Sequence, residues 1–117
     1  MILPLISHIT NLTVGNVWFY LNLYNVQYPD IVLRQSILET GWYRCEDCSM
    51  DVNNIFGFYN GSYIRFDHWI ESVEYYKKWQ DKRMPEICTE QEYYNWLKKV
   101  GYATADDYEQ KLKGIVL

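Results

Sequence analysis

Residues 29–42 read PDIVLRQSILETGW, and this stretch decides what kind of fold the chain can adopt. A proline suits the first turn of a helix, where its missing N–H would have no partner anyway, and Asp30 adds favourable charge there. Gly41 is a natural stop for such a helix. Apolar residues between these ends cover more than half of the circumference, namely Ile31, Val32, Leu33, Ile37 and Leu38. The sequence therefore predicts that this helix is central and the most buried.

Four further helices are predicted around this one from apolar residues at helical spacing. They cover residues 16 to about 25, 69 to about 85, 89–101, and a short final segment after residue 104. Thr89 followed by Glu92 fits a capping box at the start of the third of these helices. Thr104 followed by Asp107 repeats the same start signal. The sequence thus predicts a chain that is helical over most of its length.

One short β-hairpin is predicted between the helices. Residues 55–59 and 62–66 flank the pair Asn60-Gly61. This pair favours a two-residue hairpin, because both central positions of the favoured turn need positive φ. Residues 42–54 carry no apolar period and are expected to form a loop. The predicted fold class is therefore mainly α, with one short hairpin.

Size and composition indicate one self-sufficient domain over residues 1–117. A chain of 117 residues has no room for two cores, and 49% apolar residues exclude the disordered class. The 12 Tyr and 5 Trp combine a flat apolar face with a polar edge, as sugar-binding grooves need. Core packing explains at least half of these aromatic residues. We expect a monomer.

The charge distribution excludes some partners. The net charge is −4, and Lys and Arg are nowhere dense enough to follow a phosphate backbone, so nucleic acid is not an expected partner. The first 29 residues contain no Asp, Glu, Lys or Arg. Polar residues interrupt this region repeatedly, so we expect neither a membrane span nor a recognisable signal peptide. The compartment in which the protein works stays open.

Three cysteines, Cys45, Cys48 and Cys88, do not form the pattern of a disulfide-rich extracellular domain. The pair Cys45-x-x-Cys48 allows a zinc site completed by Cys88 and His68, or a redox motif. A zinc site usually shows two paired motifs, and a thioredoxin-type pair opens a helix after a strand, whereas this pair follows a helix. A disulfide or two free thiols that hold the loop are the favoured interpretations. No metal or other cofactor is expected.

Glu39 occupies the last turn of the predicted central helix, which is a poor place for a negative charge. Both the negative end of the helix dipole and the loss of water disfavour the ionised form. The pKa of Glu39 should therefore be raised toward the protonated carboxyl that a general acid requires. A surface glutamate beside a helix end would have the same spacing, so the pattern by itself leaves both interpretations open.

Four segments in order resemble the motifs of the peptidoglycan N-acetylglucosaminidases, glycoside hydrolase family 73, which includes flagellar-rod proteins and autolysins. The segments are residues 35–42 (QSILETGW), 53–57 (NNIFG), 69–72 (WIES) and 101–104 (GYAT). The chain also resembles compact members of this family from gut Bacteroidetes and their phages. The resemblance implies a lysozyme-like helical fold, no metal, and cleavage of the β-1,4 bond after N-acetylglucosamine in peptidoglycan.

The resemblance also implies roles for single residues. Glu39 takes the position of the catalytic acid, and Tyr102 that of a tyrosine that lines the cleft. Asn54, Phe56 and Gly57 match the Asn-x-Phe-Gly signature of the groove wall. A structural role for Asn54 is as well supported as a groove role, and Phe56 fits the core better. Three more aromatic residues are expected to bind substrate, namely Trp42, Tyr59 and Tyr63.

The second catalytic group is not evident, because no Asp or Glu occurs from residue 52 to residue 66, where larger relatives carry one. A two-carboxylate mechanism would have to use a residue on either side of this stretch. The candidates are Glu46, Asp47, Asp51, Asp67 and Glu71. The alternative is attack by the 2-acetamido group of the substrate itself, with Tyr102 orienting that group. The sequence slightly favours this second mechanism.

Two non-enzymatic functions compete with hydrolysis. A glycan-binding module could keep the groove without turnover, and an assembly protein could keep only the fold, with the uncharged N-terminal region as a docking surface. A carboxylate kept in an apolar helix argues against the glycan-binding module, since binding alone gives no reason for it. The sequence does not distinguish a bacterial autolysin from a phage endolysin.

Overall fold

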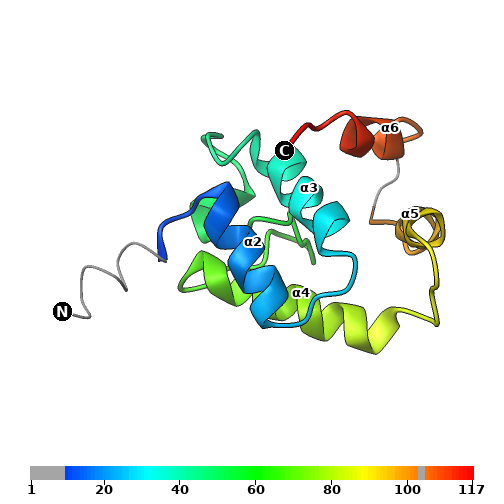
Figure 1. Cartoon of the computed structure of the whole chain (residues 1–117). Helices are drawn as coiled ribbons and strands as arrows, with labels where there is room; N and C mark the ends of the chain where they lie inside the picture. Colours follow the sequence, from blue (N-terminus) through cyan, green and yellow to red (C-terminus); the bar gives the residue numbers. More distant parts are fainter. Residues whose placement is uncertain (1–9, 103–104) are drawn as a thin grey trace.

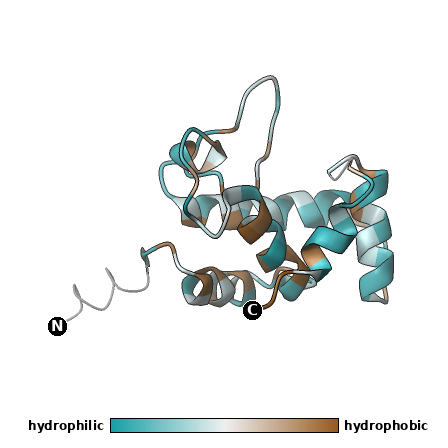
Figure 2. Cartoon of the chain, turned by 90° about the horizontal axis from the view of Figure 1, so that it is seen from above, coloured by the Kyte–Doolittle hydropathy of each residue, from teal (hydrophilic) through white to brown (hydrophobic). Residues whose placement is uncertain are grey.

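A computed structural model describes residues 10–102 and 105–117 of the chain (Figure 1). The helices are α2 (Val14–Leu23), α3 (Pro29–Thr40), the 3₁₀ helix η1 (Ser49–Val52), α4 (Trp69–Arg83), α5 (Glu90–Lys99) and α6 (Tyr108–Lys113). Helix α3 contacts α2, η1 and α6, and α2 also contacts α4. Figure 2 shows hydrophilic and hydrophobic residues along the helices, as expected for helices around a common core. The predicted mainly α fold class is confirmed.

Helix α3 is the most buried helix, and its predicted bounds are confirmed. It begins at Pro29 after Tyr28 in the left-handed conformation, and it ends at Gly41 with φ of 53°. Seven of its residues are buried, namely Ile31, Val32, Leu33, Gln35, Ser36, Ile37 and Thr40. These residues point in several directions around the helix axis, so neighbouring elements cover α3 on several sides.

The other helices begin where side chains cap them. Helix α2 starts two residues earlier than predicted, because the Thr13 hydroxyl accepts from Asn16 N at 3.1 Å. The predicted cap at Thr89 is confirmed, since its hydroxyl accepts from Glu92 N at 3.1 Å. The Glu92 carboxylate, however, bonds to the Thr89 hydroxyl and not to the backbone, so only half of the capping box forms. The predicted start signal at Thr104 lies outside the described residues.

The predicted hairpin is wrong in its extent. Among the described residues, β pairing is confined to one bridge between Tyr59 and Tyr63. Gly61 has φ of +79°, but Asn60 does not have the positive φ that the predicted two-residue turn requires. Ile64 N donates to the Phe58 carbonyl at 3.0 Å, as in a hairpin, but the Asn54 side chain occupies Phe58 N and the Ile64 carbonyl, which would otherwise pair. The segment is therefore a loop held by the Asn54 side chain rather than a pair of strands.

A chain of buried polar side chains joins α3, α4 and α5. The Tyr76 hydroxyl donates to Gln35 Oε1 at 2.5 Å and lies 2.6 Å from the Tyr93 hydroxyl. Gln80 Nε2 donates to the Tyr93 hydroxyl at 3.1 Å and to the carbonyl of Gln27 at 2.9 Å. Within the described part of the chain, every buried side-chain nitrogen and oxygen has a partner. These bonds fix the rotation of α3 about its axis, and so determine where its last turn points.

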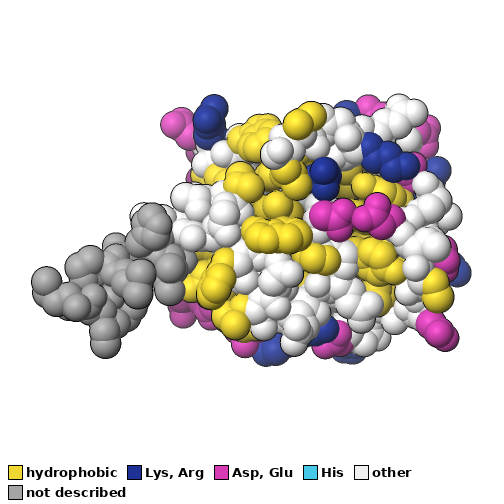
Figure 3. All heavy atoms as spheres, viewed as in Figure 1, with side chains coloured by type: hydrophobic (Ala, Val, Ile, Leu, Met, Phe, Trp, Pro, Cys, Tyr) yellow, Lys and Arg dark blue, Asp and Glu magenta, His cyan; other side chains and the backbone are white. Residues whose placement is uncertain are grey.

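Part of the surface over α2 and α3 is apolar (Figure 3). Trp18, Phe19 and Leu23 of α2 are each more than 40% exposed. No helix within residues 10–102 and 105–117 has the length and apolar character needed to cross a membrane.

Candidate active site

Glu39 projects from the last turn of α3 into a pocket of about 240 Å³, here called the Glu39 pocket. The lining residues are Glu39, Phe56, Gly57, Phe58, Tyr59, Trp79, Val100, Gly101 and Tyr102. They come from the end of α3, the loop after η1, the middle of α4 and the turn after α5. The fold thus brings three of the four sequence motifs, including the predicted catalytic position, to one place.

The environment of Glu39 suits a proton donor. Burial raises the pKa of its carboxyl group above the ordinary value. Within residues 10–102 and 105–117, Glu39 makes neither an ion pair nor a hydrogen bond that would favour the ionised form. The negative end of α3 acts in the same direction as burial. A carboxyl group held in this way can stay protonated until it reaches a substrate oxygen.

Gly57 lies directly against the carboxyl group of Glu39. A Cβ atom at this position would lie 2.8 Å from Oε2 and 3.3 Å from the carboxyl carbon of Glu39. The φ of Gly57 is +71°, a conformation that residues with side chains rarely adopt. Both the backbone conformation and the available space therefore require glycine here.

Asn54 holds the loop that carries Gly57. Its side chain is fully buried, and its Nδ2 donates to the carbonyls of Phe58 at 2.8 Å and Ile64 at 3.0 Å. Its Oδ1 accepts from Phe58 N at 3.1 Å. Of the two roles that the sequence left open, this geometry favours the structural one, because both amide donors are occupied inside the protein.

Tyr102 connects the same loop to the end of α5. Its hydroxyl donates a hydrogen bond to the backbone carbonyl of Phe56. Burial is the main reason that the pKa of Tyr102 is raised well above its ordinary value, and the nearby Glu39 carboxylate acts in the same direction. The Phe56 ring is 1% exposed and packs on Tyr76, so this residue offers the pocket its backbone rather than its ring.

A family model of glucosaminidases, described as mannosyl-glycoprotein endo-beta-N-acetylglucosaminidase, matches residues 20–117. The chain belongs to this glucosaminidase family. The match contains Glu39, Gly57 and Tyr102, which the structure brings together around one pocket. No curated protein and no solved structure matches the chain significantly. Membership supports a general role as a glycosidase that acts on N-acetylglucosamine linkages of peptidoglycan.

The exposed aromatic residues of this glucosaminidase domain divide into two groups. Tyr59 lines the Glu39 pocket and is 67% exposed, so its ring is free to contact a sugar. Its edge-to-face partner Tyr63 and the exposed Trp42 lie outside the lining. Trp79 of α4 and Val100, the C-cap of α5, do line the pocket, although the sequence did not single them out as site residues.

In the described part of the chain, Glu39 is the one carboxylate that lines the pocket. Glu71 accepts from His68 N at 3.0 Å, and His68 Nδ1 accepts from Ile70 N at 3.1 Å. Glu71 and His68 therefore form the capping box of α4, which the sequence did not predict because histidine is an unusual cap. The other candidate carboxylates are exposed and outside the lining, namely Glu46, Asp47, Asp51 and Asp67.

The cysteine pair forms a disulfide between Cys45 and Cys48, whereas Cys88 is free and exposed. The alternative of a zinc site with Cys88 and His68 is wrong, because the first two sulfurs are bonded to each other and His68 Nδ1 caps α4. No group of three or more metal-ligating side chains occurs among residues 10–102 and 105–117.

Proposed function

We propose that this glucosaminidase domain hydrolyses the β-1,4 bond after N-acetylglucosamine in bacterial peptidoglycan, with Glu39 as the general acid. The observation that carries the proposal is the half-buried Glu39 carboxyl, with a raised pKa, in a pocket that the matched family region builds. A glycan-binding module would gain nothing from such a carboxyl. The proposed reaction serves a bacterial autolysin and a phage endolysin equally well.

The proposed reaction starts with proton transfer. Protonated Glu39 donates its proton to the glycosidic oxygen, and the bond from that oxygen to the anomeric carbon breaks. The carbonyl oxygen of the substrate's own 2-acetamido group attacks the anomeric carbon and forms a cyclic oxazolinium. The Glu39 carboxylate then takes a proton from water, which opens this ring, so that configuration is retained.

Substrate assistance is favoured here by the composition of the pocket. Every described carboxylate except Glu39 lies outside its lining, so a second protein nucleophile or base has no evident position. Tyr102 would act from the pocket wall. Its hydroxyl oxygen, already a donor to Phe56, keeps lone pairs that can accept from the acetamido N–H.

Zymography on purified peptidoglycan tests the activity. Glu39→Gln should abolish clearing, since the loss of a positioned acid costs about 10²–10⁴ in rate or more. Glu74→Gln is a matched control, because Glu74 lies exposed on α4 and outside the Glu39 pocket. Equal activity of the Glu39 variant and the wild type would contradict the site. Binding without cleavage by the wild type would instead identify a non-catalytic glycan-binding module.

The identity of the bond is tested on the products. The digest is reduced with borohydride and analysed by mass spectrometry, and reduced N-acetylglucosamine should dominate. Reduced N-acetylmuramic acid as the main product would make the protein a muramidase on the same scaffold.

A further inference from the structure

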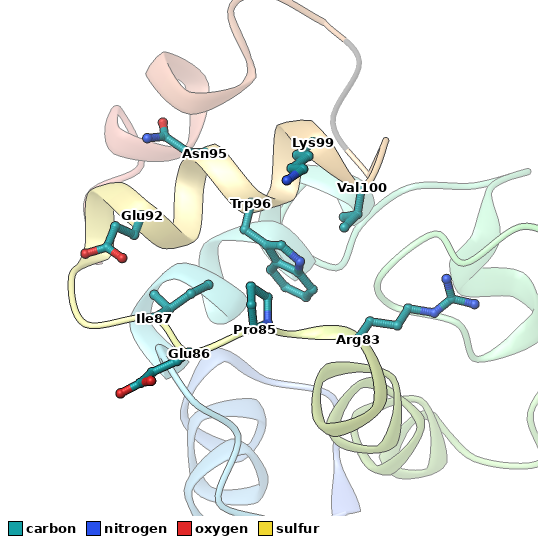
Figure 4. Close-up of a pocket in the computed structure, with 9 residues that line it drawn as sticks. All are labelled: Arg83, Pro85, Glu86, Ile87, Glu92, Asn95, Trp96, Lys99 and Val100. Carbon is teal, nitrogen blue, oxygen red and sulfur yellow. The ribbon is translucent and has the colours of Figure 1, made fainter.

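A second, larger pocket lies beside the first, between the chain that follows α4 and one side of α5 (Figure 4). Its volume is about 550 Å³. Its lining residues are Arg83, Pro85, Glu86, Ile87, Glu92, Asn95, Trp96, Lys99 and Val100. We call it the Trp96 pocket, because the Trp96 side chain projects into its middle in Figure 4.

The two pockets adjoin. Val100 lines both of them, and the rings of Trp79 and Trp96 lie 5.0 Å apart between them. A ligand that extends from the Glu39 pocket past Val100 therefore enters the Trp96 pocket. The second pocket is well placed for a branch of the molecule whose glycosidic bond lies at Glu39.

The charges of the Trp96 pocket are separated along its length. Glu92 and Lys99 lie at opposite ends of α5, about 10 Å apart at 1.5 Å per residue. The opposite wall carries its charges in the same order, because the positive Arg83 ends α4 and the negative Glu86 follows it (Figure 4). The cationic end is the one next to Val100, and therefore next to the Glu39 pocket.

Three of these charged side chains are free to bind a ligand. In residues 10–102 and 105–117, Arg83, Lys99 and Glu86 take part in none of the ion pairs, all of which lie elsewhere. All three residues are exposed. Pro85, Ile87 and Trp96 form an apolar surface between the two charged ends. The pocket thus offers, in order from the Glu39 pocket, positive charge, apolar surface and negative charge.

We propose that the Trp96 pocket binds the peptide stem of peptidoglycan, an inference that rests on the proposed function. The stem branches from a sugar and carries a glutamate carboxylate first, followed by the amine of its diamino acid, among small alanine residues. This order of charges matches the pocket from Arg83 and Lys99 to Glu86 and Glu92. The stem is therefore the occupant that both the charge order and the continuity with the Glu39 pocket favour.

Direct binding tests the site without requiring catalysis. The probe is the soluble peptide acetyl-L-Ala-γ-D-Glu-L-Lys-D-Ala, titrated into the full chain and followed by NMR chemical shifts. Its dissociation constant should rise about tenfold in the double variant Arg83→Gln/Lys99→Gln, because each exposed pair contributes up to about fivefold. The control Lys82→Gln/Lys98→Gln removes two neighbouring charges that do not line the pocket, and it should bind as the wild type does.

The negative end is tested by a second pair of measurements. Acetylation of the lysine amine of the probe should weaken binding to the wild type, but should have little further effect on Glu86→Gln. Failure of the wild type to bind the peptide, or equal binding by the Arg83/Lys99 double variant, would overturn the proposal. Single variants of Arg83 and Lys99 keep the test valid if the double variant does not fold.

Cleavage separates this inference from the proposed function. The ratio of kcat/KM on intact peptidoglycan to that on strands stripped of their stems should fall about tenfold in the Arg83/Lys99 double variant, since both charges contact only the stem. An unchanged ratio, with both substrates cleaved, would refute the stem site and leave the hydrolase standing. A wild type that binds the peptide but cleaves neither substrate would refute the hydrolase alone.

Discussion

The α-carbon of Gly57 faces the carboxyl group of Glu39 so closely that a methyl group there would lie 2.8 Å from Oε2. The two residues are separated by the disulfide loop and η1, yet they share one pocket wall. Because the carboxyl is pressed against a backbone without a side chain, the geometry of the acid depends on this glycine.

Gly57→Ala should greatly reduce the rate of cleavage while it destabilises the fold only moderately. The new Cβ would push the Glu39 carboxyl aside, and a displacement of about 1 Å can cost about 10² in rate. The strained φ should cost about 1–2 kcal/mol of unfolding free energy. The measurements are kcat/KM on peptidoglycan and the unfolding free energy in urea.

Gly61→Ala is the matched control for this prediction. Gly61 has φ of +79°, similar to Gly57, but a Cβ there would meet nothing within 4 Å. It should therefore lose a similar amount of stability and keep its activity. If both alanine variants lost activity equally, the contact between Gly57 and Glu39 would not matter for catalysis.

The dependence of kcat/KM on pH should show a single falling limb. Burial raises the pKa of Glu39, so the protonated acid persists above the ordinary pH range of a carboxyl and activity declines as pH rises through that raised pKa. Substrate assistance needs no second ionised carboxylate, so no rising limb is expected at acid pH while the protein stays folded. A bell-shaped profile would point to a protein base.

Amide variants of the five candidate carboxylates should each be mild. Each lies outside the lining of the Glu39 pocket, and Glu71 should show only the loss of its helix cap, about 1 kcal/mol of stability. The rate of each variant and the configuration of the product, followed by NMR, show whether any of these carboxylates acts as a second catalytic group. One variant as inactive as Glu39→Gln, together with inverted product, would identify the missing base. The variants are Glu46→Gln, Asp47→Asn, Asp51→Asn, Asp67→Asn and Glu71→Gln.

Glu39→Gln should stabilise the fold at neutral pH. The folded protein holds the Glu39 proton more tightly than the unfolded chain does, because burial raises the pKa in the folded state. The favourable contribution of the carboxyl is thus complete below the unfolded pKa and is lost as pH rises through the folded pKa. Thermal unfolding should therefore give a higher Tm for the variant at pH 7 and similar values near pH 3. A wild type that is more stable at both pH values would contradict a raised pKa.

Tyr102→Phe should reduce both activity and stability. The variant loses the hydrogen bond to the Phe56 carbonyl, which should cost about 1–3 kcal/mol because the carbonyl is left without its buried donor. Under the proposed reaction it also loses the partner of the acetamido group, so kcat should fall. Tyr108→Phe is the control, since its hydroxyl accepts from Gln35 Nε2 at 3.4 Å and does not line the Glu39 pocket. If Tyr102→Phe changed stability alone, the tyrosine would have only a structural role.

Most of the helical framework was predictable from the sequence. Pro29 and Gly41 mark the two ends of α3, and the cap at Thr89 marks the start of α5. These signals act within one or two turns, so residues near each other in the chain suffice to predict them. The hairpin is shorter than predicted because the Asn54 side chain, several residues away from the turn, occupies Phe58 N and the Ile64 carbonyl, two groups that would otherwise pair.

The sequence by itself determined the position of the predicted acid, because Glu39 lies in the last turn of the most buried helix and Gly41 follows as its cap. Only the tertiary structure decided what surrounds that acid. The contact with Gly57, the bond from Tyr102 to Phe56 and the wall formed by Trp79 and Val100 join segments far apart in the chain. The raised pKa of Glu39 has the same origin, since burial depends on all the segments that exclude water and not on the spacing within one helix.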